Sequence, residues 1–325
     1  SSLAVLIVVL MLLALAMPAS AAGGENTLTV GPGQEYATIQ AAVDAAKQGA
    51  KILVYPDYYE ESVMVTTNNL QIIAQGEGVI VHPPARPAGF EVRADHVTVR
   101  GFEIGYGADW APAIDFEGSH NIFADNHIYL DVPVALGVNA LVCRDPDGGS
   151  DFNIIEGNTI FQADLGIVIT TDTDDAINRD NVIRNNTLQL VAQSPIVAVN
   201  ARGFLISGNS IDGAPFGHCI GVGTLGANKI AQGHHTIADN TMGRCAGNGI
   251  SLYATPGGTL THNHLAGNWV QGCGADCIAL EAGEGATLSH NQVLDNEASF
   301  SQICGIKVGA YPWDAPDVSM TNNLV

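Results

Sequence analysis

The stretch "IIEGNTI", residues 154–160, decides the fold, because its pattern returns along most of the chain. Its Asn is preceded by an apolar residue three positions earlier and followed by another apolar residue two positions later. The stretch "VRGFEI" at 99–104 fits the same frame with Phe102 in place of Asn. The Asn residues that share the frame are Asn126, Asn158, Asn186, Asn209, Asn240, Asn263, Asn291 and Asn323.

Successive members of this set are 23 to 32 residues apart, and a second short strand signal lies between them. It reads "GISL" at 249–252, "CIAL" at 277–280 and "GIKV" at 305–308. A repeat of this length with short apolar strands predicts a solenoid. A leucine-rich repeat needs several Leu per repeat, whereas these coils prefer Ile, Val and Gly, so we exclude it.

Asn suits a turn between two strands because it tolerates the left-handed backbone that a sharp bend requires. Stacked Asn amides can also hydrogen-bond to one another along the axis of the solenoid. We therefore predict an all-β solenoid in which the eight Asn form one line. The low charged fraction, 14%, and the 37 Gly also favour strands and turns over long helices.

The repeat resembles the right-handed parallel β-helix of the pectate-lyase and polygalacturonase-like superfamily, over about residues 27–325. The resemblance implies one domain, with any substrate along the outer face of the strands typified by "CIAL". The segment "YATIQAAVDAAKQG" at 36–49 has apolar residues on one helical face, which predicts an N-terminal capping helix. Val325 falls inside a repeat unit, so we expect the natural protein to continue beyond it.

Residues 1–22 are interpreted as a secretory signal peptide whose start is missing. The apolar run from Leu3 to Met17 is too short to span a bilayer comfortably, and Ala19-Ser20-Ala21 is a small-x-small cleavage signature. A buried N-terminal helix is the alternative. A signal peptide predicts a secreted, periplasmic or cell-surface protein with no membrane span in the mature chain.

The formal net charge is -21, with only 12 Lys and Arg against 33 Asp and Glu. Such a surface repels nucleic acid, so we predict no nucleic-acid partner. It also repels polyuronates, unless cations such as Ca²⁺ bridge the charges. The charge therefore favours a neutral or weakly charged glycan as the polysaccharide partner.

The Cys residues gain meaning from the repeat. Cys245 and Cys273 each lie five residues before the strand Ile of their coils, and equivalent positions in adjacent coils are about 4.8 Å apart. Cys277 and Cys304 could pair in the same way, whereas Cys143 and Cys219 have no obvious match. Buried free thiols are the alternative for all of them, and a metal site at Cys273 and Cys277 is disfavoured for lack of further ligands at suitable spacing.

Catalytic candidates come from the strand face and from the stretch "GHC" at 217–219, which resembles the Gly-His-Gly segment of polygalacturonases. A glycosidase needs two carboxyl groups at the scissile bond, and a uronate lyase needs a base and positive charge. The coil before His218 carries no acid, so we expect His218 to be a turn or packing residue. The catalytic candidates are His218, Asp276, Glu281 and Lys307.

Other candidates are a binding set and a metal set. Asp172, Asp174 and Asp175 in "TTDTDD" follow a strand and could bind Ca²⁺ or sugar, although a solvated loop is the plainer interpretation. Arg202, one coil further on, and Tyr253, on the strand face, complete the substrate-binding candidates. The metal candidates, which stand directly before frame Asn residues and could equally be polar turn residues, are Asp239, His262 and His290.

Three functions follow from these observations. The first is an exported β-helix protein that binds or processes an extracellular glycan, in the manner of a hydrolase or a lyase. The second is a non-catalytic structural or surface β-helix, favoured by a strand face made mostly of small, neutral residues. The third is a periplasmic metal-handling β-helix, which rests on Asp239, His262 and His290 alone. Whether the protein is an enzyme stays open at this point.

Overall fold

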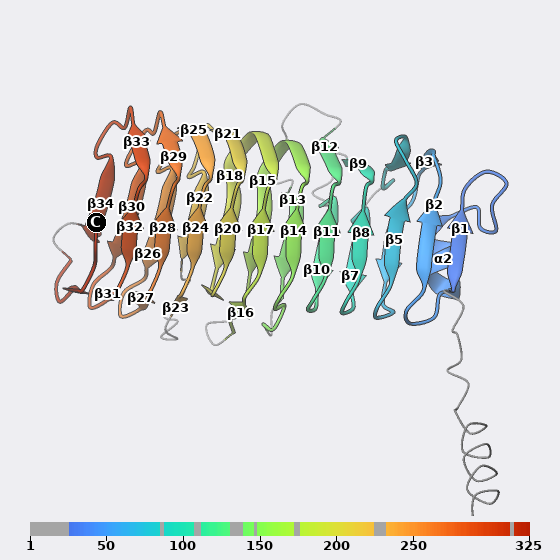
Figure 1. The fold of residues 1–325 in the computed structure, drawn as a ribbon, viewed down its shortest axis with the longest axis horizontal. Coiled ribbons are helices and arrows are strands. Elements are labelled where there is room, and N and C mark those ends of the chain that lie inside the picture. Colours follow the sequence, from blue (N-terminus) through green and yellow to red (C-terminus); the bar gives the residue numbers. More distant parts are fainter. Residues whose placement is uncertain are drawn as a thin grey trace, which may run out of the picture.

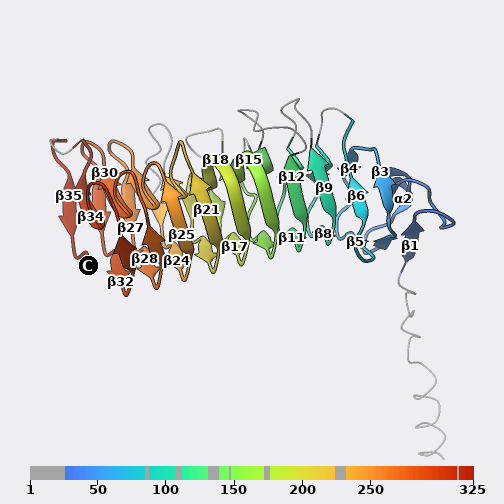
Figure 2. The ribbon, with the colours of Figure 1, turned by 90° about the horizontal axis from the view of Figure 1, so that it is seen from above.

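The computed structural model describes residues 26–84, 88–106, 112–130, 139–145, 148–171, 176–223, 232–312 and 315–325. These residues form a right-handed parallel β-helix, as the repeat predicts. Its coils follow one another in chain order along the long axis in Figures 1 and 2. The expected signal peptide lies outside the described residues, and within them no helix is long and apolar enough to cross a membrane.

Each coil contributes short strands to up to four columns, and neighbouring strands in a column run parallel. The first column is an 11-stranded sheet. Its strands are β1 (Thr27–Val30), β2 (Lys51–Val54), β5 (Gln71–Ala74), β8 (Thr98–Arg100), β11 (Ile122–Ala124), β14 (Ile154–Glu156), β17 (Val182–Arg184), β20 (Leu205–Ser207), β24 (Thr236–Ala238), β28 (His264–Ala266) and β32 (Gln292–Leu294).

The 18-stranded sheet comprises two columns, joined where β15 (Thr159–Thr170) and β18 (Thr187–Val199) are long enough to serve both. One column continues through β3 (Asp57–Tyr59), β6 (Val79–Val81), β9 (Glu103–Tyr106), β12 (His127–Leu130), β21 (Ser210–Ala214), β25 (Thr241–Cys245), β29 (Trp269–Gln271) and β33 (Glu297–Ser299). The other, called the groove column below, contains β4 (Val63–Val65), β7 (Phe90–Arg93), β10 (Ile114–Glu117), β13 (Asn139–Arg144), β22 (Ile220–Gly223), β26 (Ile250–Ala254), β30 (Ile278–Ala282) and β34 (Ile306–Ala310).

A six-stranded sheet forms the last column and lies between the groove column and the first sheet along the chain. Its strands are β16 (Asn178–Arg179), β19 (Ala201–Arg202), β23 (Gln232–Gly233), β27 (Thr259–Thr261), β31 (Thr287–Ser289) and β35 (Ser319–Thr321). Alternate residues of all the columns point inward, so their Ile, Val and Leu side chains stack into one buried core. Phe90 packs edge-on against Phe102 in this core, with ring centroids 5.1 Å apart.

The predicted capping helix is present as α2 (Ile39–Ala45), beside β1 at one end of the stack in Figure 1. Its apolar face, which includes Ile39 and Val43, is buried. The hydroxyl of Thr38 accepts the N–H of Ala41 at 3.2 Å, and the carboxylate of Glu61 accepts the N–H groups of Ile39 and Gln40 at 2.8 and 3.0 Å. These bonds satisfy the free amides of the first turn, and the helix covers core that would otherwise face water.

The Asn residues form two ladders, which corrects the prediction of a single line. In the first ladder, each amide oxygen accepts the backbone N–H of the ladder residue one coil earlier, as in Asn209 to Asn240 at 3.0 Å. This ladder contains Asn126, Asn158, Asn186, Asn209, Asn240, Asn268 and Asn296. The second ladder, at the other end of the first-sheet strands, is interrupted by Phe204 and contains Asn121, Asn153 and Asn181 before it and His235, Asn263, Asn291 and Asn323 after it.

The predicted line therefore follows the first ladder as far as Asn240 and the second ladder from Asn263 onward. Leu265 follows Asn263 by two positions and precedes Asn268 by three, so it satisfies the sequence frame for both. The two turns lie five residues apart, on either side of a three-residue strand. The single-line prediction held only for Asn126 to Asn240.

The disulfide candidates are also corrected. Cys219 pairs with Cys245, with Cα atoms 5.6 Å apart, whereas Cys273, Cys277 and Cys304 are free. Equivalent positions in parallel strands are close, but their side chains point the same way, whereas a disulfide needs Cβ atoms that face each other. The Cys273 thiol instead lies 2.7 Å from the thiol of Cys277 in its own coil.

Removing the disulfide should cost a measurable part of the stability. We expect Cys245→Ser to lower the free energy of unfolding by about 2–4 kcal/mol, because the bridge closes a long loop in the unfolded chain. Urea unfolding followed by circular dichroism measures this. Cys304→Ser, at an exposed free thiol, is the matched control and should change nothing. Equal midpoints for the two variants would contradict the prediction.

Candidate functional site

An open groove of about 570 Å³ lies on the outer face of the groove column, across β22, β26, β30 and β34. The floor of the groove is formed by small outward residues of these strands. Gly221, Ser251 and Ala279 are such residues, and they pair in register. A Cβ atom built on Gly221 would meet nothing within 4 Å, so the space above it is open. The alternation in "IVAV" at 196–199 predicts Ala198 and Asn200 on this face, but in the structure Val197 and Val199 lie there, in register with Gly221 and Gly223.

One side of the groove is formed by a third ladder, at the turn before the groove column. The ring Nδ1 of His218 accepts the N–H of Asn248 at 2.8 Å. The amide oxygen of Asn248 accepts the N–H of Asp276 at 3.1 Å, and Asp276 Oδ1 accepts the N–H of Cys304 at 2.9 Å. Each of these residues stands two positions before a strand Ile, and this shared offset is the sequence signal that could have revealed Asn248.

His218 serves this turn and also lines the groove. Because Nδ1 accepts a backbone N–H, the proton of the neutral ring is on Nε2. Burial lowers the pKa of His218, although the charge of Glu281 acts in the opposite direction. Gly247 is needed beside the ring, since a Cβ atom there would lie 2.7 Å from His218 Nδ1. His218 is therefore a neutral imidazole held by the turn at neutral pH.

Two buried carboxyl groups and one ammonium group meet in the groove. Lys307 Nζ donates to Glu281 Oε1 at 2.5 Å and lies 4.0 Å from Asp276 Oδ2. Asp276 is only 3% exposed and Glu281 only 8%, so both need such partners. Burial alone would lower the pKa of Lys307, but the hydrogen bond and charge of Glu281, with Asp276, raise it above its usual value. Lys307 is therefore a fixed cation between two acids.

Two aromatic rings form the other side of the groove. Tyr253 and Tyr311 pack edge to face with centroids 6.2 Å apart, and Lys307 Nζ lies 5.6 Å from the centroid of the Tyr311 ring. Burial, followed by the charge of Glu281, raises the pKa of Tyr253, so its hydroxyl stays protonated and able to donate. The half-exposed ring of Tyr311 offers an apolar surface to a ligand.

The structure thus brings together His218, Asp276, Glu281, Lys307 and Tyr253, which come from four successive coils. It separates the other candidates from them. Arg202 belongs to β19 in the six-stranded sheet, where it pairs with Arg179 and does not reach the groove. Asp172, Asp174 and Asp175, the Ca²⁺ candidates, lie outside the described residues.

The metal set is wrong. Asp239 follows β24 at one end of the first sheet, whereas His262 precedes β28 at the other end. His262 stacks on His290, with ring centroids 4.8 Å apart and planes at 4°, and on His234 at 4.9 Å. All three His have positive φ and belong to the turn of the second ladder. In the part of the chain that the structure describes, no group of three or more His, Cys, Asp or Glu could hold a metal ion.

A family model described as a right handed beta helix region matches residues 139–325, more than half of the chain. Among solved structures, the chain is similar to an alginate lyase from Paenibacillus sp. str. FPU-7, with TM-score 0.58, 15% identity, and coverage of 86% of this chain and 99% of that one. For a GH136 lacto-N-biosidase from Eubacterium ramulus the values are 0.57, 11%, 91% and 68%.

The tailspike protein of E. coli bacteriophage HK620, in complex with a pentasaccharide, is similar with TM-score 0.52 and 12% identity, over 88% of this chain and 60% of that one. No curated protein matches the chain. At these identities the similar structures establish a shared fold.

Proposed function

We propose that this chain, which belongs to the right-handed β-helix family, binds a neutral or weakly charged glycan in the groove and hydrolyses it there. The observation that carries this proposal is the pair of buried carboxyl groups, Asp276 and Glu281, on either side of Lys307. The similar structures include an alginate lyase and a lacto-N-biosidase, which supports a glycan as the substrate without deciding its charge.

Glycoside hydrolysis needs one carboxyl group to protonate the leaving oxygen and another to act as nucleophile or to activate water. Lys307 Nζ lies 2.5 Å from Glu281 Oε1 and 4.0 Å from Asp276 Oδ2. The distance between these two carboxylate oxygens therefore cannot exceed the sum of the two contacts. That limit suits a pair that flanks one glycosidic bond. Lys307 also offsets one of the two negative charges, which reduces their mutual repulsion.

The rest of the groove suits a sugar without net charge. Tyr253 and Tyr311 can stack against the C–H face of a pyranose, while Asn248 and Ser251 are polar groups for its hydroxyls. A polyuronate would bring further negative charge to two carboxylates on a chain of net charge -21. Secretion is part of this proposal, because the Cys219–Cys245 disulfide and the signal-like residues 1–22 both suit an oxidising compartment.

A uronate lyase is the second candidate, favoured by one specific observation. The Lys307 ammonium could offset the charge of a substrate carboxylate, and the protonated Tyr253 hydroxyl could donate a proton to the leaving oxygen in a β-elimination. A panel of neutral and anionic polysaccharides, each incubated with the protein with and without Ca²⁺, separates the candidates. Hydrolysis produces new reducing ends without ultraviolet absorbance, whereas a lyase produces an absorbing unsaturated sugar. Cleavage of no polymer would favour the structural β-helix.

His218 should contribute little to the chemistry. We expect His218→Ala to leave kcat/KM for the cleaved glycan within about tenfold of the parent, because Nδ1 is engaged by the Asn248 backbone and the ring mainly holds the turn. Steady-state kinetics on the best polymer of the panel measures this. A loss of about a thousandfold, with an unchanged circular dichroism spectrum, would instead place His218 among the catalytic groups.

A further inference from the structure

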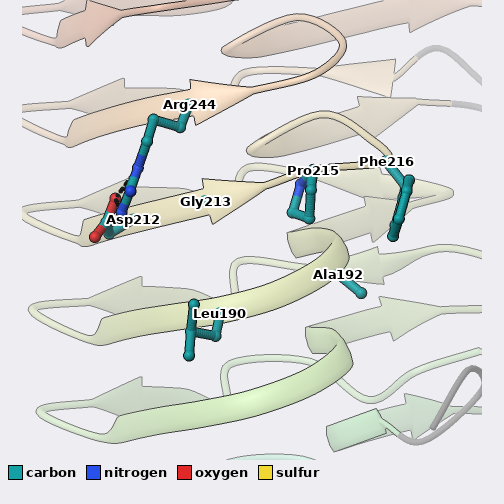
Figure 3. A pocket seen from close by; sticks show the side chains of 7 residues that line it. All are labelled: Leu190, Ala192, Asp212, Gly213, Pro215, Phe216 and Arg244. Atoms are coloured by element: carbon teal, nitrogen blue, oxygen red, sulfur yellow. Dashed lines mark hydrogen bonds and ion pairs between the residues drawn. The ribbon is translucent and has the colours of Figure 1, made fainter. Parts of the chain in front are cut away.

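A second depression, of about 350 Å³, lies around the corner from the groove on β18, β21 and β25. Figure 3 shows its lining side chains, with Arg244 and Asp212 at one end and Pro215 and Phe216 at the other. We propose that it binds one uncharged pyranose ring of the same glycan, as a subsite beyond the groove. This inference rests on the proposed function, which it extends from the site of cleavage to the path of the chain.

The apolar end of the depression can take the C–H face of a sugar. Phe216, at this end, is 74% exposed although it is a large apolar side chain, whereas Leu190, 49% exposed, lies on the side of Asp212 in Figure 3. Pro215 lies beside Phe216 in Figure 3. Exposed aromatic rings grouped with other apolar side chains mark binding sites, and sugars stack on such rings.

The polar end determines the charge of the ligand. Arg244 Nε donates to Asp212 Oδ1 at 2.8 Å, and Arg244 Nη2 contacts the same oxygen. The pair is neutral as a whole, yet it retains spare N–H donors and a second carboxylate oxygen. Hydroxyl groups can use both, whereas an anion would meet Asp212 and a cation would meet Arg244. An uncharged polyol ring is therefore the occupant that the depression fits.

The space between the two ends is kept open by the turn. Gly213 lies there with φ 98°, and a Cβ atom built on it would meet nothing within 4 Å, so any other side chain would project into the depression. Leu190 and Arg244 hold the corresponding turn position in the neighbouring coils, also with positive φ, at 54° and 59°. Bulky side chains are disfavoured in that conformation, so these two are not the residues that the turn itself would select.

The depression and the groove share one wall. Phe216 lines the depression, and His218, two residues further on, lines the groove. One coil earlier, Ala192 and Ser194 divide between the two sites in the same way. A glycan bound in the groove that crosses this turn reaches the depression directly. The subsite therefore extends the groove across the coils instead of along the axis of the β-helix.

The test compares Phe216→Ala with Phe300→Ala, because Phe300 is 83% exposed at the equivalent turn of a later coil and lies outside both sites. The probes are cello-, xylo- and galacto-oligosaccharides from disaccharide to octasaccharide, with kcat/KM and calorimetric Kd measured for each. We expect Phe216→Ala to lose at least tenfold more kcat/KM on the longest cleaved probe than on the shortest. Phe300→Ala should match the parent on every probe.

Equal losses at all lengths, or none, would overturn the subsite while leaving the hydrolase proposal intact. Calorimetry separates the opposite case: if no probe is cleaved but the parent binds the longer ones, and Phe216→Ala weakens that binding at least tenfold, the subsite stands and hydrolysis fails. Binding that Phe216→Ala and Phe300→Ala weaken equally would overturn the subsite, because exposed aromatic surface in general would then be responsible. Failure of every probe to bind the parent would overturn it as well.

Discussion

Glu281→Gln should reduce glycan cleavage by about a thousandfold or more and leave the fold intact. The change removes one of the two carboxyl groups that hydrolysis needs, and general acid–base catalysis alone is worth about 10²–10⁴-fold. It keeps the size of the side chain. In the parent, Lys307 Nζ donates to Glu281 Oε1 at 2.5 Å, and the amide oxygen of Gln can still accept that hydrogen bond. Reducing-end assays on the best glycan of the panel measure the loss.

Glu297→Gln is the matched control, because Glu297 is exposed on β33, outside the groove. It should behave as the parent. Asp276→Asn should lose cleavage to a similar degree, since its amide oxygen can still accept the N–H of Cys304 and preserve the turn. If Glu281→Gln retained a tenth of the parent kcat, the carboxyl pair would not be the catalytic machinery, and the lyase or structural alternatives would take its place.

Asn209→Leu should destabilise the whole domain, by about 3 kcal/mol or more. The Asn209 side chain donates to the Ile183 carbonyl at 3.0 Å and to Asn240 at 2.9 Å, and accepts two N–H groups of Asn186 at 3.0 Å. Each buried hydrogen bond contributes about 1 kcal/mol, and partners left unsatisfied cost more. Leu would also place a branched apolar side chain in a closely packed turn.

Urea unfolding and the Tm measure this loss, with Asn296→Leu for comparison. Asn296 makes equivalent bonds at the last rung of the ladder but is half-buried, so water can replace part of what is lost. We expect a clearly smaller effect there. An unchanged Tm for Asn209→Leu would mean that the ladder adds nothing to stability beyond the strands themselves.

The candidate site could not be predicted from single coils of the sequence. Asp276, Glu281 and Lys307 each looked weak in the sequence, because no coil contains a complete catalytic set. The parallel register pairs Glu281 of β30 with Tyr253 of β26 in the preceding coil. It also places Lys307 of β34, in the following coil, near both Glu281 and Asp276. Asn248 was missed, although it stands two positions before a strand Ile, as His218 and Asp276 do.

The Asn ladders and the disulfide, which stabilise the fold, could not be assigned from single coils either. Asn263 and Asn268 stand in equivalent apolar frames, and only the strand pairing of β28 with β24 and β32 assigns them to different turns. Cys245 was correctly expected to form a bridge, but its partner Cys219 belongs to a different strand position. Sequence spacing measures how far apart two residues are along a coil, and it does not measure the direction of their side chains.

The sequence by itself determined the repeat, the short parallel strands, the inward apolar positions outside β18 and the capping helix α2. These features depend on local periodicity and on the burial of one strand face, which each coil expresses separately. Only the tertiary structure decided which Asn share a ladder, which Cys pair, and that two acids of one coil and a lysine of the next meet in one groove. Those relations depend on coil-to-coil register and side-chain direction, which arise only when the coils stack and small changes in coil length are absorbed in the turns.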